Sequence, residues 1–428
     1  MTDRRNAEEL TRRLFHGLPR ADQRRWAGAY MTGLLSTPGK KSVRNMGWSV
    51  CASYTASQSL HQVVNESTWS WTDVRRELTA WCHERTEVRG WALERVMMPK
   101  RGHYSAGVHR RFDATAGRTL GCQLGLGLFL LTGSGAAVPV DWRLYLPDEW
   151  LDDASLRRRA RIPDTVRAGS PGGLMVDLAA TTAGPGAPLV ADAETVGEAA
   201  ELIEGFDALG VDWAVSVPAT TPVFAAPQPA ARRPGQAPCG TVVSAGGLAG
   251  QMRDSARGLG AGPAVSGPAV SSAPAVSGPS VSGAPHSPGV LPVHVYAAHA
   301  VGPLRLVASW APGKRAPERV WLTTLHGERL TGAAALFTRR VVGAEALEGL
   351  DDCGMRDFEG RSYPGWHRHM SLVSAAYAHR MLDASEARAA SDARAADRVA
   401  DRVPQRVGER VGGRGLGRGV RRTGVKAA

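Results

Sequence analysis

The stretch LGCQLGLGLFLLTGSGAAVPVDWRLYL, residues 120–146, decides the fold class of this chain. From Leu120 to Leu131, large apolar residues such as Leu124 and Leu128 alternate with small or polar ones, which is the period of a strand with one buried face. The TGSG segment at 132–135 has the composition of a turn, and 138–146 predicts a returning strand. A further strand is predicted at 91–96, so the three strands would form a meander.

A second pattern follows the meander. Residues 189–193 (LVADA) predict a short buried strand, 196–209 an amphipathic helix, and 211–217 (VDWAVSV) another strand. Such a strand–helix–strand unit is expected to be parallel and right-handed. A meander followed by this unit is the element order of a ribonuclease-H-like α/β fold, a mixed sheet flanked by helices, although other α/β folds share parts of it.

Composition divides the rest of the chain. Residues 1–89 carry helix-period apolar positions, and 90–218 hold the first part of the core. The Ala/Pro/Gly/Ser-rich segment 219–289 is expected to be a disordered linker, since it has little apolar bulk to offset its ordering entropy. We expect a small insertion sheet at 290–331, C-terminal core helices at 332–383, and a basic disordered tail at 384–428, where Pro404 and several glycines interrupt a repeat of arginines.

The charge balance favours a polyanionic partner such as nucleic acid. Lysines and arginines number 52 against 40 acidic residues, which gives a formal charge of +12. Much of the excess lies at 384–428, where a solvated tail is the alternative interpretation.

The five cysteines, at positions 51, 82, 122, 239 and 353, form no CxxC pair, which favours a reducing cytoplasm over a disulfide scaffold or a zinc finger. The charged N-terminus MTDRRNAEELTRRLF lacks the apolar core of a secretory signal. The uncharged stretch 119–140 is interrupted by glycines, so no membrane span is predicted. The chain has no Walker loop, no GxGxxG motif after a strand and no Ser–His–Asp pattern at convincing spacing, which argues against a nucleotide-dependent enzyme or a serine hydrolase.

Five longer strings point to one family: ADQRRWAGAYMTGLLSTPGKKSVRNM at 21–46, QSLHQVVNESTWSW at 58–71, PKRGHYSAGV at 99–108, VDWRLYLPDEW at 140–150 and YPGWHRHMSLVSAAYAH at 363–379. They resemble insertion-sequence transposases of the DDE superfamily of the actinobacterial type, and they occur in that family's order. The resemblance implies a helical DNA-binding region at 1–89 and a core that cleaves and transfers DNA strands. Its partner would be double-stranded DNA at the element's ends, in the cytoplasm at the nucleoid. A homodimer is left open.

The family's chemistry uses three carboxylates that hold two divalent ions, Mg²⁺ or Mn²⁺, on the reacting phosphodiester. The resemblance implies this triad, but the chain has an acid at only some of the family's three positions. Where the family has a pair of aspartates, this chain has Glu94 and Arg95, and the arginine places a permanent positive charge where an acid is expected. Asp192 in LVADA matches the second aspartate. The third acid would fall at 343–344, where there is none, and Glu345 is the nearest carboxylate. The candidate catalytic and metal-binding residues are therefore Glu94, Asp192 and Glu345, in a triad that we expect to be eroded.

Basic residues inside the matching strings or just after one of them are the predicted DNA contacts, because guanidinium and ammonium groups bind phosphate. A solvated basic surface is the alternative. The predicted set is Lys40, Lys41, Arg44, Lys100, Arg101, Arg110, Arg111 and Arg368.

Three functions remain open at this point. The first is a transposase-family protein that binds DNA but cleaves it weakly or not at all. The second is an active transposase that uses Glu94, Asp192 and Glu345 as a shifted triad. The third is an interaction protein that no longer binds DNA.

Overall fold

The structure is a computed structural model that describes residues 2–51, 53–113, 116–184, 186–225, 241–258, 293–296, 300, 302–311, 313–333 and 342–400. Contacts within the chain separate two compact units, Met1–Asp383 and Ala384–Ala428, and the sheet lies in the first. Among the described residues, no helix is both long and apolar enough to cross a bilayer.

The N-terminal region is helical, as predicted. Ser42 begins one helix by accepting a hydrogen bond from the Asn45 amide at 3.2 Å, and Ser70 caps another by accepting one from the Asp73 amide at 3.2 Å. Leu10, inside this region, is fully buried. The helices are α1 (Thr2–Leu14), α2 (Ala21–Ser36), α3 (Val43–Cys51), α4 (Tyr54–Asn65) and α5 (Trp71–Arg85).

The predicted meander is confirmed. β1 (Val88–Pro99), β3 (Arg118–Thr132) and β4 (Ala137–Leu144) are antiparallel, and Leu126 of β3 pairs with Arg95 on one side and Arg143 on the other. An additional strand, β2 (His109–Asp113), pairs with the first residues of β3. The turn between β3 and β4 needs its glycine, because Gly135 has a φ of 83°, a conformation that other residues rarely adopt.

The strand–helix–strand unit is also confirmed. β5 (Leu189–Asp192) lies between β1 and β6 (Trp213–Val217) and is parallel to both, and α9 (Val196–Leu209) connects β5 to β6. The resulting strand order, β4-β3-β1-β5-β6, belongs to a ribonuclease-H-like mixed sheet. Three more helices lie between β4 and β5: α6 (Asp148–Asp152), α7 (Ala154–Ala160) and α8 (Pro171–Thr182).

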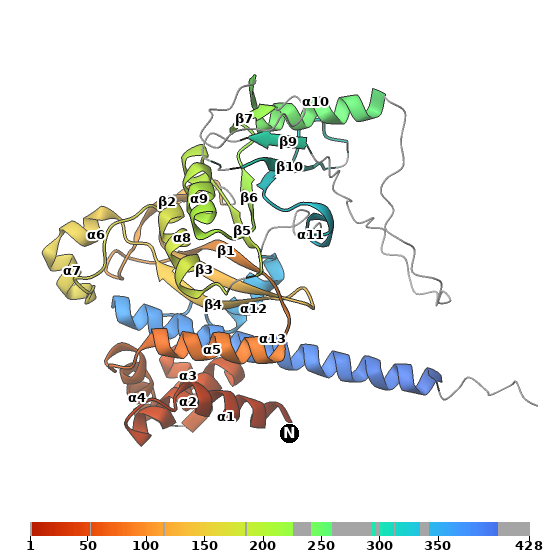
Figure 1. The fold of residues 1–428 in the computed structure, drawn as a ribbon. Helices are drawn as coiled ribbons and strands as arrows, with labels where there is room; N and C mark the ends of the chain where they lie inside the picture. Colours follow the sequence, from red (N-terminus) through yellow and green to blue (C-terminus); the bar gives the residue numbers. More distant parts are fainter. Residues whose placement is uncertain are drawn as a thin grey trace, which may run out of the picture. The chain divides into compact units, whose positions relative to one another are not determined.

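Helices cover both faces of this sheet (Figure 1). On one face, α8 packs against α9, and Arg95 of β1 reaches Glu198 of α9. On the opposite face lies α13 (Tyr363–Ala400), where Ser374 accepts a 2.8 Å hydrogen bond from the indole of Trp142 on β4. The first part of α13 is almost entirely buried, and one continuous apolar core joins it to the sheet and to the N-terminal helices.

The segment between β6 and the last helices differs from expectation. We expected a separate small sheet at 290–331, but β11 (Arg319–Thr323) pairs with β6, so these strands extend the central sheet. Two strands and a helix fall inside the expected linker 219–289, and the rest of that linker lies outside the described residues. The other elements are β7 (Pro222–Ala225), β8 (Val242–Ser244), α10 (Ala245–Gly258), β9 (Val293–Tyr296), β10 (Leu304–Ser309) and α11 (Gly327–Gly332).

The C-terminal core consists of α12 (Ala344–Asp352) and the first part of α13. We expected a disordered tail from residue 384, but α13 continues to Ala400. Residues 401–428 of that tail lie outside the described part of the chain.

Candidate active site and nucleic-acid contacts

The sheet brings two of the three candidate carboxylates together. Leu93 of β1 pairs with Ala191 of β5, so Glu94 and Asp192 stand one residue farther along two neighbouring parallel strands. Adjacent strands lie about 4.8 Å apart, and residues in register project from the same face. Asp192 is the last residue of β5, at the end of the strand where open α/β sheets usually place their ligands, and Glu94 lies beside it in the middle of β1.

Asp192 is held by a cation. Arg319, the first residue of β11, donates from Nη1 to both carboxylate oxygens of Asp192, at 3.0 and 3.1 Å. Both side chains are about three-quarters buried, with 23% and 24% exposed. The contact is possible because β5, β6 and β11 are consecutive strands of one sheet.

Arg95 forms a second group of ion pairs. Consecutive strand residues project from opposite faces, so Arg95 points away from the face of Glu94. Its guanidinium contacts the carboxylates of Glu198 and Glu194, and it also donates to the backbone carbonyl of Asp192. Burial raises the pKa of Glu198, and the nearby Arg95 charge offsets part of that rise. The predicted positive charge is present, but it is neutralised by glutamates on the α9 face.

Glu345 is not brought into this cluster. It lies in the first turn of α12, where its side chain is exposed. Its negative charge adds to the rise that burial causes in the pKa of Tyr377 on α13. Among the described residues, which include all three candidates, no group of three or more His, Cys, Asp or Glu side chains is placed to hold a metal ion. As arranged, the site does not fit the two-ion centre that the resemblance implies.

Three of the predicted DNA contacts have internal partners instead. Arg368 is 6% exposed and donates to the backbone carbonyls of Trp69 and Val64 at 3.2 and 3.1 Å. Lys41 is buried, and its ammonium donates to a backbone carbonyl in the loop after α2. Lys100 donates to the Phe358 carbonyl at 2.8 Å, and burial lowers its pKa to about 8. In these positions the three cations join segments of the fold.

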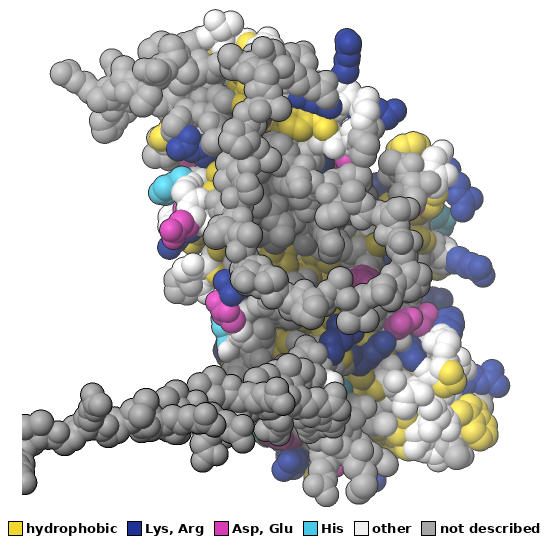
Figure 2. All heavy atoms as spheres, turned by 90° about the vertical axis from the view of Figure 1, so that its right-hand side faces the viewer, with side chains coloured by type: hydrophobic (Ala, Val, Ile, Leu, Met, Phe, Trp, Pro, Cys, Tyr) yellow, Lys and Arg dark blue, Asp and Glu magenta, His cyan; other side chains and the backbone are white. Residues whose placement is uncertain are grey.

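The other predicted contacts lie nearer the surface. Lys40 pairs with Glu359 at 2.6 Å, and Arg111 pairs with Glu194. In the described part of the chain, Arg44, Arg101 and Arg110 are exposed and form no ion pair. Figure 2 shows Lys and Arg side chains at many places on one face of the molecule, several with acidic side chains beside them.

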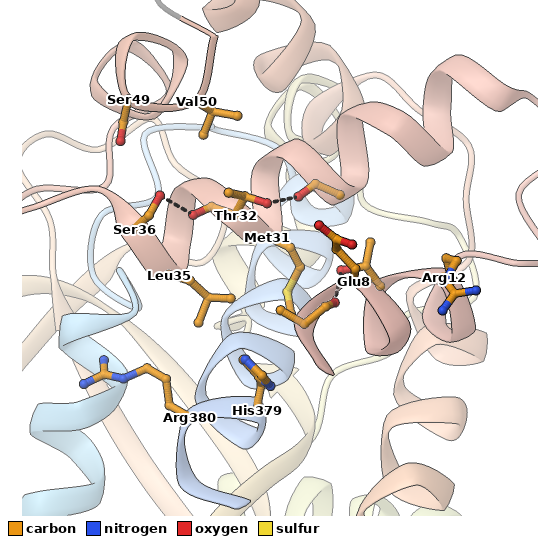
Figure 3. Close-up of a pocket in the computed structure, with 13 residues that line it drawn as sticks. Glu8, Arg12, Met31, Thr32, Leu35, Ser36, Ser49, Val50, His379 and Arg380 are labelled. Atoms are coloured by element: carbon orange, nitrogen blue, oxygen red, sulfur yellow. Dashed lines mark hydrogen bonds between the residues drawn. The ribbon is translucent and has the colours of Figure 1, made fainter. Parts of the chain in front are cut away.

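A cavity of about 980 Å³ lies among α1, α2, α3 and α13, away from the carboxylates (Figure 3). Met31, Leu35 and Val50 supply apolar walls, and Glu8, Arg12, His379 and Arg380 supply polar ones. In α2, which lines the cavity, the Ser36 hydroxyl donates to the Thr32 carbonyl at 2.7 Å, and the Thr32 hydroxyl donates to the Gly28 carbonyl at 3.0 Å. None of the candidate catalytic residues lines this cavity, so it is separate from the carboxylate site.

Arg319 is the site residue that sequence reasoning missed. It lies 127 positions from Asp192 and follows the segment 219–289, which we expected to be a disordered linker. Only the pairing of β11 with β6 brings it to Asp192.

Comparison with known proteins agrees with the fold. No curated protein matches the chain. Residues 13–247, more than half of the chain, match the model of a family described as DDE superfamily endonuclease. The match covers the N-terminal helices, the meander, β5 and β6. This chain therefore belongs to the DDE superfamily endonuclease family, the transposase-type proteins built on a ribonuclease-H-like sheet.

Proposed function

We propose that this protein is a DNA-binding member of the transposase type whose metal-dependent cleavage is weak or absent. The observation that carries the proposal is the contact of Arg319 with both oxygens of Asp192. The ancestral reaction would be cleavage and transfer of DNA strands in the transposition of an insertion sequence, with Mg²⁺ or Mn²⁺ as cofactor and the element's ends as substrate.

Electrostatics explains why this contact opposes cleavage. A divalent ion at Asp192 would have to displace a partly buried guanidinium that already neutralises the carboxylate. Removing one partner of such a pair leaves the other charge uncompensated, and the cost is several kcal/mol for buried pairs. Metal binding would also have to proceed without Glu345, because that side chain lies in the first turn of α12 and faces solvent.

Binding to duplex DNA is supported by charge. The formal charge is +12, Arg44 and Arg101 are exposed cations in the strings that resemble the family, and the exposed Arg110 follows one of these strings. Such side chains bind phosphate without sequence preference, and the affinity falls steeply as salt increases. We expect this binding to take place in the cytoplasm, at the nucleoid.

The test is metal-dependent nicking of supercoiled plasmid DNA, run beside a binding titration on a duplex over a range of salt. We expect salt-sensitive binding, with no Mg²⁺- or Mn²⁺-dependent nicking above that of Asp192→Ala. Arg319→Ala should bind Mn²⁺ more tightly than the wild type, because Asp192 is released. Arg329→Ala serves as the matched control, since this exposed arginine on α11 pairs with Asp212 instead.

An active enzyme is the second candidate, and the position of Glu94 beside Asp192 on parallel strands favours it. Nicking by the wild type that is lost in Asp192→Ala would establish that enzyme and overturn the proposal. If the protein fails to bind duplex DNA at low salt, the remaining candidate is an interaction protein derived from a transposase.

A further inference from the structure

A pocket of about 780 Å³ lies beside β2, and none of the candidate carboxylates lines it. It is formed by the loop before β2, by β2 itself, by the segment after β4 and by α7. Its basic side chains are His103, His109, Arg110, Arg111 and Arg159, and its aromatic ones are Tyr104, Tyr145 and Trp150. Glu149 is the acidic residue in its lining. Pockets that bind small organic groups have volumes of about 300–1,000 Å³.

Tyr104 is the exposed aromatic ring of this pocket. Its exposed fraction is 56%, although large aromatic side chains are usually buried. Two guanidinium groups lie over the ring: that of Arg159 is 5.0 Å from the ring centroid, and that of Arg361 is 5.5 Å from it. Within the described residues, neither arginine forms an ion pair with an acid, so both positive charges are available to an anion.

The histidine in the wall supplies a second observation. His109 Nδ1 lies 2.9 Å from the Gly107 carbonyl, and a carbonyl can only accept, so Nδ1 is the donor in this contact. The other ring nitrogen, Nε2, is buried and has no hydrogen-bond partner in the part of the chain that the structure describes. Buried polar atoms are nearly always satisfied, and an exception calls for an explanation such as a ligand.

We propose that this pocket binds one nucleotide, with its base stacked on Tyr104 in place of the Arg361 guanidinium and its phosphate held by Arg159 and Arg110. An exposed aromatic ring beside unpaired arginines is the combination that proteins use to hold single-stranded nucleic acid, because every base has a face that can stack and every nucleotide a phosphate. The same chemistry describes a free nucleotide and a nucleotide within a strand. If the nucleotide belongs to a DNA strand, the inference rests on the proposed function; if the nucleotide is free, it does not.

The experiment measures binding of a short fluorescent single-stranded oligodeoxynucleotide to the full chain by anisotropy. Tyr104→Leu should weaken binding about tenfold, the size expected for one stacked base, while Tyr104→Phe keeps the ring and should bind like the wild type. Arg159→Gln should weaken binding and flatten its salt dependence, because one phosphate contact is lost. Arg89→Gln is the matched control, since this exposed arginine on β1 lies outside the pocket.

Competition identifies the source of the nucleotide. Displacement of the oligonucleotide by a deoxynucleoside monophosphate, but not by inorganic phosphate, shows that a free nucleotide is sufficient. Binding that depends on Tyr104 and resists both competitors assigns the pocket to a strand. Inorganic phosphate that competes as well as the monophosphate would show that no base is recognised, and the inference would be wrong.

The inference also fails if Tyr104→Leu binds the oligonucleotide like the wild type. If duplex DNA still binds in that case, the proposed function stands without the pocket. If the wild type binds neither single strands nor duplex, both proposals fall.

Discussion

Replacing Arg75 with alanine should be among the most destabilising single changes in the N-terminal helices. Arg75 lies on α5 with 4% of its surface exposed, and its guanidinium joins three segments. It donates to Ser371 Oγ at 2.7 Å, to Asp141 at 2.8 Å and to the Trp142 carbonyl at 2.7 Å. It also approaches the ring nitrogen of His367 at 3.2 Å and donates to the His367 carbonyl at 2.9 Å. Burial lowers the pKa of Arg75, and the nearby Asp141 carboxylate offsets part of that effect.

The magnitude follows from what the substitution leaves behind. Breaking a buried ion pair by removing one partner costs about 3–5 kcal/mol. Asp141 is still served by the Thr182 hydroxyl at 2.7 Å and by the Trp142 amide at 2.7 Å, and 18% of its side chain is exposed. These donors reduce the penalty, so we expect the lower end of the range, about 3 kcal/mol.

The neighbouring Arg76 provides a matched control. It occupies the same helix and pairs with Asp73, but both side chains are exposed, 71% and 66%. Exposed pairs contribute about 0–1 kcal/mol, so Arg76→Ala should leave stability nearly unchanged. Urea unfolding followed by circular dichroism, with hydrogen exchange of α5 amides, compares the two variants. Equal unfolding midpoints for Arg75→Ala and Arg76→Ala would refute the reasoning.

Two further predictions concern the core. A Cβ at Gly127 would lie 2.7 Å from Phe129 and 2.8 Å from Trp142, so Gly127→Ala should lower the free energy of unfolding by about 1–3 kcal/mol through overpacking. Gly121→Ala on the same strand is the control, because a Cβ there meets only a carbonyl at 3.5 Å. An equal loss of stability in urea for both variants would contradict the argument. Burial lowers the pKa of His369 to about 4, from an ordinary value of 6.5, so the unfolded chain binds this proton first and stability falls as pH decreases from 6.5 towards 4. Between pH 7 and 5 the loss from this group is about 2 kcal/mol at 1.36 kcal/mol for each pKa unit, and His369→Gln should remove that part of the pH dependence. Parallel profiles of unfolding free energy against pH for the variant and the wild type would show that His369 is not responsible.

The local parts of the fold could be predicted because short stretches of sequence determine them. The alternation in β3 and the β5–α9–β6 unit each depend on residues within one or two dozen positions of one another. The pairing of β11 with β6 could not be predicted in this way, because a strand of five residues carries no signal for a partner so far along the chain.

The site could be predicted only in part for the same reason. Glu94 and Asp192 could be proposed because the resemblance to the family assigns each acid to a short stretch of sequence, whereas the contact of Arg319 with Asp192 depends on tertiary structure. Positive charge alone does not distinguish an exposed arginine from a buried one. Arg368 was therefore predicted to contact DNA, although its guanidinium lies against backbone carbonyls from segments about 300 residues away in the sequence.

The pairing of β6 with β11 also sets an order of events during synthesis. Val217 and its partner Val320 are separated by roughly 100 residues, which a ribosome needs about 5–20 s to add at 5–20 residues per second. During that interval the nascent chain holds Trp213, Val215 and Val217 on a strand whose outer edge has no neighbour. An open, apolar edge of this kind can pair with another chain. Slow translation between residues 218 and 319 should therefore increase co-translational aggregation, and a ribosome-associated chaperone that covers the edge should reduce it.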